Sequence, residues 1–200
     1  MPTTFSRQKT AVMFVVVTAL LAVYFTAAGL YFPQLYLSLE QHYPAPYISS
    51  VTISNSSILL GQPFEITVVG TNRGVTSDMQ TLSISFPNMT DTSGIQILEE
   101  NFSQHPTTIE KGQEIGSHYQ GTQYPAYAQY PIVESYNRPW DAGASHEIRL
   151  AITPQSSGKF LVLVKSVVLP HSNTVHYPTS GVLDQQGEYA RPYLVNVTKR

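Results

Sequence analysis

The chain has 200 residues, a net charge of −2 and only 12% charged residues. It has no basic stripe of the kind that binds nucleic acid, so we expect no nucleic-acid partner. It also has no cysteine, which excludes disulfides, thiolate nucleophiles and metal sites built on cysteine. Motifs of serine hydrolases, P-loop proteins and dinucleotide-binding proteins are absent, so we expect a non-catalytic protein without a cofactor.

The first strong signal is an uncharged, apolar run of 23 residues at positions 10–32. As a helix it would be about 34 Å long, enough to cross a hydrocarbon core of about 30 Å. A cleaved signal peptide is the alternative, with Thr26-Ala27-Ala28 as its cleavage site. Signal peptides have apolar cores of about 7–15 residues, so the length of this run favours a retained transmembrane helix.

Charges near this run predict its orientation. Arg7 and Lys9 come directly before it, and the next basic residue is Arg73. Because positive charge marks the cytoplasmic side, we expect a single-pass protein of the cell membrane with its N-terminus inside. Pro33 is expected to end the helix, since it lacks an amide hydrogen. The predicted order is residues 1–9 in the cytoplasm, helix 10–32, a proline-containing stalk at 33–46, and an extracellular domain at 47–200.

Small residues recur along one face of the predicted helix. Thr18, Ala22 and Thr26 are spaced four residues apart, and Gly29 falls near the same stripe. Small side chains let two transmembrane helices approach closely, so this face is a candidate helix-packing surface. The alternative is that Thr and Ala are simply common in any anchor.

Strand patterns dominate the rest of the chain. Apolar residues alternate with polar ones, or form short apolar runs, and the segments are separated by turns rich in Gly, Pro, Asn and Ser. We expect an antiparallel β-sandwich, Ig-like or cupredoxin-like. The predicted strands contain Val51 and Ile53, Phe64–Val68, Leu82–Phe86, Ile95 and Ile97, Ile148–Ile152, Phe160–Val168, and Leu194–Val197.

One stretch, at about 103–145, lacks this alternation and is expected to be a structureless insert. It is rich in tyrosine, among Gln, Pro and Gly. Long inserts are often functional, and tyrosine combines a large contact area with a polar tip. This insert is therefore either a partner-binding surface or a loop draped over the sandwich. The candidate partner-binding residues are Tyr119, Tyr124, Tyr127 and Tyr130.

Histidines offer a possible metal site. His171 and His176 follow the most apolar strand, and imidazoles that converge at one end of a sandwich can bind copper or zinc. The alternative is that these are solvated loop histidines. His146-Glu147 begins like a zinc-protease motif, but the second histidine is missing. Trp140, the single tryptophan, is expected to fill the core rather than to bind a ligand.

Four of the seven asparagines begin Asn-X-Ser/Thr sequons, where chance predicts about one or two. This excess favours glycosylation of a surface domain in an archaeal or eukaryotic host. Because an exported domain without disulfides is more typical of prokaryotes, we expect an archaeal protein. The candidate glycosylation sites are Asn55, Asn88, Asn101 and Asn196.

The segment Ile58–Val68, followed by Thr71–Gly74, resembles the opening hairpin of Ig-like surface domains of the CARDB type. Residues from Trp140 to Pro154, and then Gly158–Phe160, resemble the later strands of these domains. The resemblance implies a membrane-anchored surface domain that functions in adhesion or assembly.

The layout of Gly143–Val197 is similar to the cupredoxin-like domain in the B subunit of copper membrane monooxygenases, including archaeal ammonia monooxygenase. That family binds copper through a His-x-His pair and an N-terminal histidine. This chain has His171 and His176 in that region but no His-x-His pair. The resemblance implies either a copper-binding subunit or a related subunit without copper.

These signals together predict a protein that contacts membrane lipid and whose exterior sandwich binds other membrane or surface proteins. An accessory subunit of a membrane complex and a surface-interaction protein both fit. Two alternatives are a copper-binding monooxygenase subunit and a pilin-like filament subunit, because pilins also place a β-domain after an N-terminal apolar helix.

Overall fold

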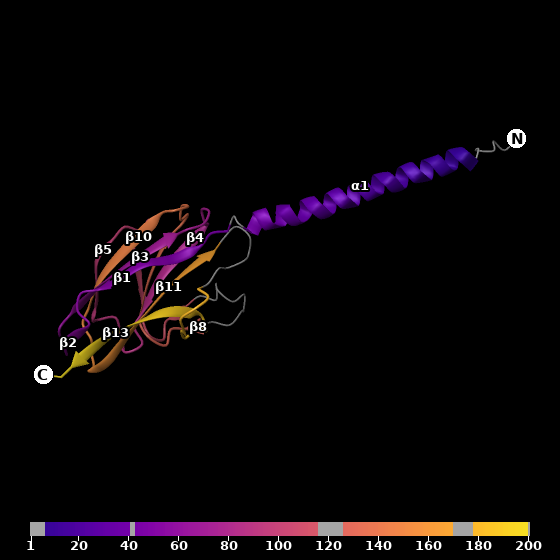
Figure 1. Ribbon diagram of the computed structural model, residues 1–200. Coiled ribbons are helices and arrows are strands. Elements are labelled where there is room, and N and C mark those ends of the chain that lie inside the picture. Colours follow the sequence, from indigo (N-terminus) through magenta and orange to yellow (C-terminus); the bar gives the residue numbers. More distant parts are fainter. Residues whose placement is uncertain (1–6, 41–42, 116–125, 170–177, 200) are drawn as a thin grey trace. The chain divides into compact units, whose positions relative to one another are not determined.

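The computed structural model describes residues 7–40, 43–115, 126–169 and 178–199. The chain divides into two compact units, residues 1–43 and 44–200, which we describe separately (Figure 1). The first unit contains the helix, and the second contains all the strands.

The helix, α1, extends over Arg7–Glu40. Its segment Val12–Leu30 has a mean hydropathy of 2.2 and none of it is buried, so the chain has one N-terminal apolar helix long enough to cross a membrane. The prediction that Pro33 ends the helix is wrong, and the first part of the expected stalk is helical. Proline removes one helical hydrogen bond and crowds the preceding turn, but the Leu, Gln and Glu residues that follow it are good helix formers.

All seven predicted strand segments coincide with strands of the second unit that pair antiparallel, although Phe86 lies one residue beyond the end of its strand. Alternation of apolar and polar residues was therefore a reliable guide wherever one face of a strand packs on the core. These strands are β1 (Pro46–Ile53), β3 (Phe64–Asn72), β4 (Met79–Ser85), β5 (Ile95–Glu100), β10 (Ser145–Ile152), β11 (Gly158–Leu169) and β13 (Tyr189–Thr198).

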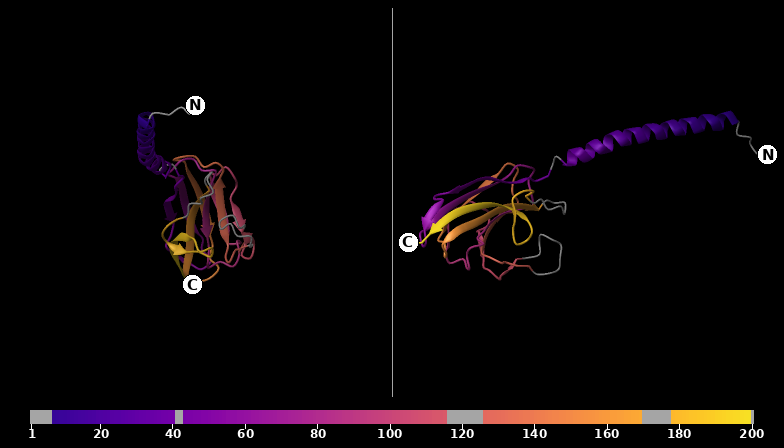
Figure 2. Two further views of the ribbon diagram at one scale, coloured as in Figure 1. Left: turned by 90° about the vertical axis from the view of Figure 1, so that its right-hand side faces the viewer. Right: turned by 60° about the horizontal axis from the view of Figure 1, so that its bottom comes forward.

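Two sheets form a sandwich (Figures 1 and 2). One has the strand order β1-β3-β10-β5, and the other has the order β12-β13-β11-β4-β9-β6, with β2 added in parallel beside β13. A separate small sheet pairs β7 with β8. The additional strands are β2 (Ser57–Leu59), β6 (Thr107–Ile109), β7 (Glu114–Ile115), β8 (Ala126–Tyr127), β9 (Ile132–Asn137) and β12 (Val182–Leu183).

The core lies between the two sheets and is apolar. Alternate residues of β3 and β10, such as Ile66 and Leu150, pack with Leu82 of β4 and Val164 of β11. Trp140 is fully buried in this core, as predicted, and its indole Nε1–H donates to the Ala144 carbonyl oxygen at 3.0 Å. Apolar burial of this kind contributes about 25 cal/mol per Å² and is the main stabilising term of the domain.

The expectation of a structureless insert at 103–145 is wrong, because this stretch contains β6, β7, β8 and β9. Strand β9 pairs with β4 over its whole length. Its core-side residues after Val133 are Ser135 and Asn137, which are polar although they are 1% and 2% exposed. Asn137 Oδ1 accepts a hydrogen bond from the Ser103 amide at 2.6 Å. Because polar residues occupy core positions of β9, its sequence does not show the alternation of apolar and polar residues by which a strand is recognised.

Candidate functional site

The outer face of the seven-stranded sheet, which points away from the core, is polar and yet buried. Along β4 this face carries Thr81, Ser83 and Ser85, which are 3–6% exposed. A solvated sheet face would leave such side chains in water. Other segments of the chain therefore cover this face.

One row of polar residues crosses four strands of this face in register. Lys165 of β11 lies opposite Ser83 of β4, Ser83 lies opposite Glu134 of β9, and Glu134 lies opposite Thr107 of β6. Directly opposite residues have Cβ atoms about 5 Å apart, so the four side chains form one continuous strip.

A small second core covers part of this face. It consists of Ile109, Ile115, Ala128 and Ile132, with the partly buried Tyr130 packed against them. Residues 110–115 and 126–128 form this cover together: the Gly112 amide donates to the Ala128 carbonyl, and the Ala128 amide donates to the Gln113 carbonyl. These two segments are thus hydrogen-bonded to each other and also pack against the sheet.

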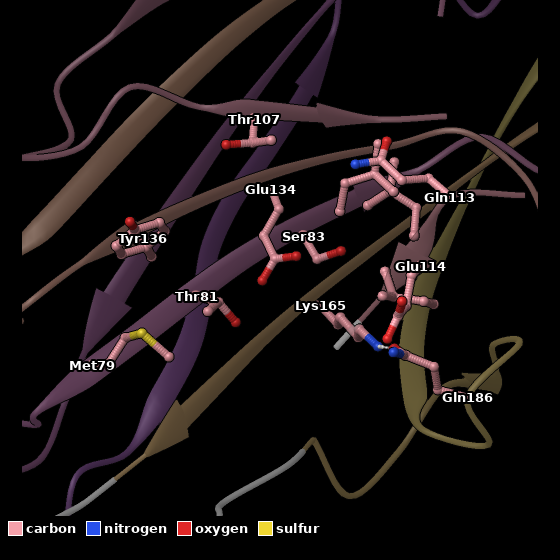
Figure 3. Close-up of a pocket in the computed structure, with 13 residues that line it drawn as sticks. Met79, Thr81, Ser83, Thr107, Gln113, Glu114, Glu134, Tyr136, Lys165 and Gln186 are labelled. Atoms are coloured by element: carbon pink, nitrogen blue, oxygen red, sulfur yellow. Dashed lines mark hydrogen bonds between the residues drawn. The ribbon is translucent and has the colours of Figure 1, made fainter. Parts of the chain in front are cut away.

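Between the sheet and its cover lies a pocket of about 360 Å³ (Figure 3). The side chains of Glu134 and Ser83 lie next to each other on its floor, and Lys165 and Gln186 lie together at one side. Hydroxyl, carboxylate, amide and apolar groups share the wall. The lining residues are Met79, Thr81, Ser83, Thr107, Ile109, Gln113, Glu114, Ile115, Ile132, Glu134, Tyr136, Lys165 and Gln186.

Lys165 is 7% exposed and is held by a turn that follows β12. Its Nζ donates to Asp184 Oδ2 and to Gln186 Oε1, each at 2.5 Å, and also to Glu188. Asp184 Oδ1 in turn accepts the backbone amides of Gln186 and Glu188, at 2.8 and 3.0 Å. A buried ammonium group is tolerated only with such partners, so Lys165 fixes the turn at 184–188 against the sheet.

Burial changes the titration of two groups here. Desolvation raises the pKa of the Glu188 carboxyl, and the charge of Lys165 opposes that shift without cancelling it. Desolvation likewise raises the pKa of the Tyr130 phenol. The Tyr130 oxygen accepts a hydrogen bond from the Gln185 amide at 3.0 Å, which joins the turn at 184–188 to the second core.

Two of the four tyrosines predicted to bind a partner belong to the cover of this pocket. Tyr127 is 57% exposed and pairs in β8 with Glu114, a residue of the pocket wall. Tyr130 is partly buried and has the structural role described above. Tyr119 and Tyr124 lie outside the described residues.

The histidine candidates for a metal site, His171 and His176, also lie outside the described residues. In the part of the chain that the structure describes, no three His, Cys, Asp or Glu side chains are grouped closely enough to hold a metal ion. His146 lies 2.9 Å from the Asn101 carbonyl oxygen through Nδ1 and packs edge-on against Trp140. Its ring is thus part of the packing around Trp140.

The small-residue stripe of α1 has local hydrogen bonds. The Thr18 hydroxyl donates to the Phe14 carbonyl at 2.8 Å, and the Thr26 hydroxyl donates to the Ala22 carbonyl at 2.7 Å. These bonds satisfy the hydroxyls within the helix and leave the stripe apolar on its surface. Packing of this stripe, including Gly29, against another helix stays a prediction.

The sequence interpretation missed the ionic cluster of Lys165, Asp184 and Glu188. One signal was present, because Lys165, followed by Ser166, interrupts the otherwise apolar run Phe160–Val168. A lysine in the middle of a buried strand requires a buried partner. The sequence contains no local pattern that identifies this partner, since the two carboxylates come from a turn about 20 residues later.

No protein-family model matches the chain, and no curated protein sequence matches it. Several solved structures have a similar fold. A CARDB domain from Pyrococcus furiosus, solved with di-metal ions, is 11% identical, with 78% of this chain and 90% of that chain covered and a TM-score of 0.40. The major pilin subunit of Bacillus cereus is 12% identical, with coverages of 77% and 41% and a TM-score of 0.41.

An immunoglobulin-like protein from Nocardia farcinica is 11% identical, with 73% of this chain and 97% of that chain covered and a TM-score of 0.38. The two facing sheets described above make residues 44–200 a β-sandwich of the Ig-like class, as predicted. A CARDB domain and Ig-like folds are among the structures that it resembles.

Proposed function

We propose that this protein is a single-pass membrane protein whose exterior Ig-like domain binds a partner protein, as an accessory subunit of a membrane complex. The observation that carries this proposal is the covered polar pocket on the outer face of the seven-stranded sheet. Four strands contribute to its floor or wall, and two further segments are held over it. A sheet face that is simply exposed to solvent would have no covering segments and no buried lysine.

The chemistry of the pocket suits a hydrogen-bonding side chain of the partner. Thr81, Ser83 and Thr107 offer hydroxyls that can donate or accept, and Glu134 offers a carboxylate. The ammonium group of Lys165 is bonded to the turn at 184–188, and the lining also carries the carboxylates of Glu114 and Glu134. A basic group of the partner would therefore meet complementary charge at this wall. A volume of about 360 Å³ is at the small end of ligand pockets and suits one or two side chains.

The rim of the pocket favours a protein over a small molecule. Tyr127 is exposed beside Glu114, and tyrosine is enriched at the centre of protein interfaces because it offers a large area with a polar tip. A partner that inserts a side chain into the pocket would also cover the ring of Tyr127.

The apolar helix supports a location at the membrane. Val12–Leu30 is long enough to span the bilayer, and the basic residues Arg7 and Lys9 precede it. By the positive-inside rule this arrangement supports an exterior sandwich, which would meet neighbouring membrane or surface proteins.

Co-purification from detergent-solubilised membranes tests the proposal. The full-length wild type is compared with Glu134→Gln, which removes a charge inside the pocket, and with Tyr127→Ala at its rim. Each has a control of the same residue type outside the pocket, at the exposed positions Glu65→Gln on β3 and Tyr189→Ala on β13. We expect each pocket variant to reduce recovery of the same partner at least tenfold, and the controls to retain it.

Two results would contradict the proposal. One is a wild-type protein that purifies alone under conditions that keep other membrane complexes intact. The other is a partner whose recovery is unchanged by both pocket variants. Circular dichroism of each variant separates loss of binding from loss of the fold.

A further inference from the structure

We propose that one end of the sandwich carries three N-linked glycans, at Asn55, Asn88 and Asn196. This end, which we call the far end, lies opposite the end at which the chain enters β1 at Pro46. It contains the turn after β1, the turn after β4, the first residues of β11 and the last residues of β13.

Exposure divides the asparagines of the described chain into two groups. The four sequon asparagines are all exposed, whereas the two others, Asn72 and Asn137, are 0% and 2% exposed and begin no sequon. Asn72 Nδ2, for example, donates to the carbonyls of Val75 and Trp140. Because a glycan is attached at Nδ2, the sequons occur only where that atom is within reach of a modifying enzyme.

Hydrogen bonds and strand pairing bring three of the four sequons together around the start of β11. The Asn196 amide donates to the carbonyl of Ser56, the neighbour of Asn55. Asn196 also pairs with Lys159 of β11. Two residues further along β11, the Leu161 amide donates to Asn88 Oδ1 at 2.7 Å. The three acceptor sites therefore form one patch, although Asn55 and Asn196 lie near opposite ends of the sandwich sequence.

The hydrogen bond of Asn88 is compatible with modification of its side chain. Strand β4 ends at Ser85, which pairs with Leu163, so the amide of Leu161 extends past the end of its neighbour. Asn88 Oδ1 accepts the hydrogen bond of that amide, which a neighbouring strand would otherwise accept. A glycan on Nδ2 leaves Oδ1 free to keep this bond, so the modification requires no change in the fold.

Asn101 is the exception in position. It lies at the other end of the sandwich, where its Oδ1 accepts the Glu147 amide at 2.7 Å between β5 and β10. It is exposed and can also be modified, but it is not part of the far-end patch. Glycans at the far end would cover that surface and would direct protein contacts to the sheet faces, where the pocket lies.

The inference shares one premise with the proposed function, the exterior location of the sandwich. The test uses full-length protein from the membranes of its native host, with intact mass and glycopeptide mass spectrometry. We expect a glycan at each of Asn55, Asn88 and Asn196. The variants Ser57→Ala, Thr90→Ala and Thr198→Ala should each lose one glycan mass, because each destroys a sequon without changing its asparagine.

Matched controls keep each sequon intact. Ser57→Thr, Thr90→Ser and Thr198→Ser should retain the full mass. An intact mass equal to that of the bare polypeptide, or modification of Asn101 alone, would overturn the inference. Protease added to intact cells separates the two proposals: a sandwich that is digested but bare contradicts only the glycans, whereas a protected sandwich contradicts the exterior location on which both depend.

Discussion

The inner and outer faces of the seven-stranded sheet use the same strands but opposite chemistry. On β4 the inner face carries Leu82 and Ile84, and the outer face carries Thr81 and Ser83. All four are buried. The inner face meets another sheet, whereas the outer face meets a short hairpin and the turn at 184–188.

The two faces should respond differently to mutation. Apolar burial is non-directional, so the inner face loses stability in proportion to the volume that is removed. In a buried polar network, the loss of stability does not depend on the volume removed. Removing one group leaves its partners without a hydrogen bond or a counter-charge, and that penalty is large for a single substitution. Four substitutions test this contrast, from the largest expected effect to the smallest.

Trp140→Ala should be the most damaging change at the inner face. Trp140 is fully buried, and its ring packs edge-on against Phe102 and His146. We expect a loss of about 3–5 kcal/mol in the free energy of unfolding, from lost transfer energy and a residual cavity. Urea unfolding of the sandwich followed by circular dichroism measures it, since the variant lacks the single tryptophan as a probe. A loss below about 1 kcal/mol would mean that the core relaxes around this site.

Lys165→Met should be nearly as damaging at the outer face. The change keeps an unbranched side chain of similar size but leaves Asp184 and Glu188 buried without their cation. We expect a loss of about 3 kcal/mol at neutral pH, and a smaller loss in acid, where the two carboxyls take up protons. Lys159→Met, at an exposed position of the same strand, is the control and should change stability by less than about 0.5 kcal/mol. An equal loss at both pH values would argue against the charge mechanism.

Tyr130→Phe should have a moderate effect. The substitution keeps the ring in the second core and removes the acceptor of the Gln185 amide. We expect a loss of about 1 kcal/mol, and faster hydrogen exchange at Gln185 than in the wild type. Tyr127→Phe, at an exposed ring in the same segment, is the matched control. Unchanged exchange at Gln185 would show that the turn at 184–188 does not depend on this bond.

Glu188→Gln should change the pH dependence more than the stability itself. Burial raises the pKa of Glu188 in the folded protein, so the folded state holds this proton more tightly than the unfolded chain. The linked stability is present below the ordinary pKa of about 4.3 and is lost as pH rises through the higher folded value. Glutamine does not titrate. The stability of the wild type relative to the variant should therefore fall across this window, and a flat difference would contradict the shift.

The candidate site could be predicted only in part. Tyr127 was singled out from the sequence as a contact residue and is exposed at the rim of the pocket. The floor of the pocket was not predicted, because Ser83, Glu134 and Lys165 belong to three strands whose register is set by the fold. Strand β9 was missed for a related reason, since Ser135 and Asn137 occupy core positions with polar side chains.

The sequence by itself determined the apolar helix, the seven principal strands and the sandwich class. These follow from local patterns: length and hydropathy for the helix, and a period of two for each strand. Only the tertiary structure decided which polar residues are buried, that Lys165 meets a turn formed later in the chain, and that Asn55, Asn88 and Asn196 share one end. Periodicity reports which face of a strand is apolar, whereas strand order and register, set by packing across the whole domain, determine which distant residues meet.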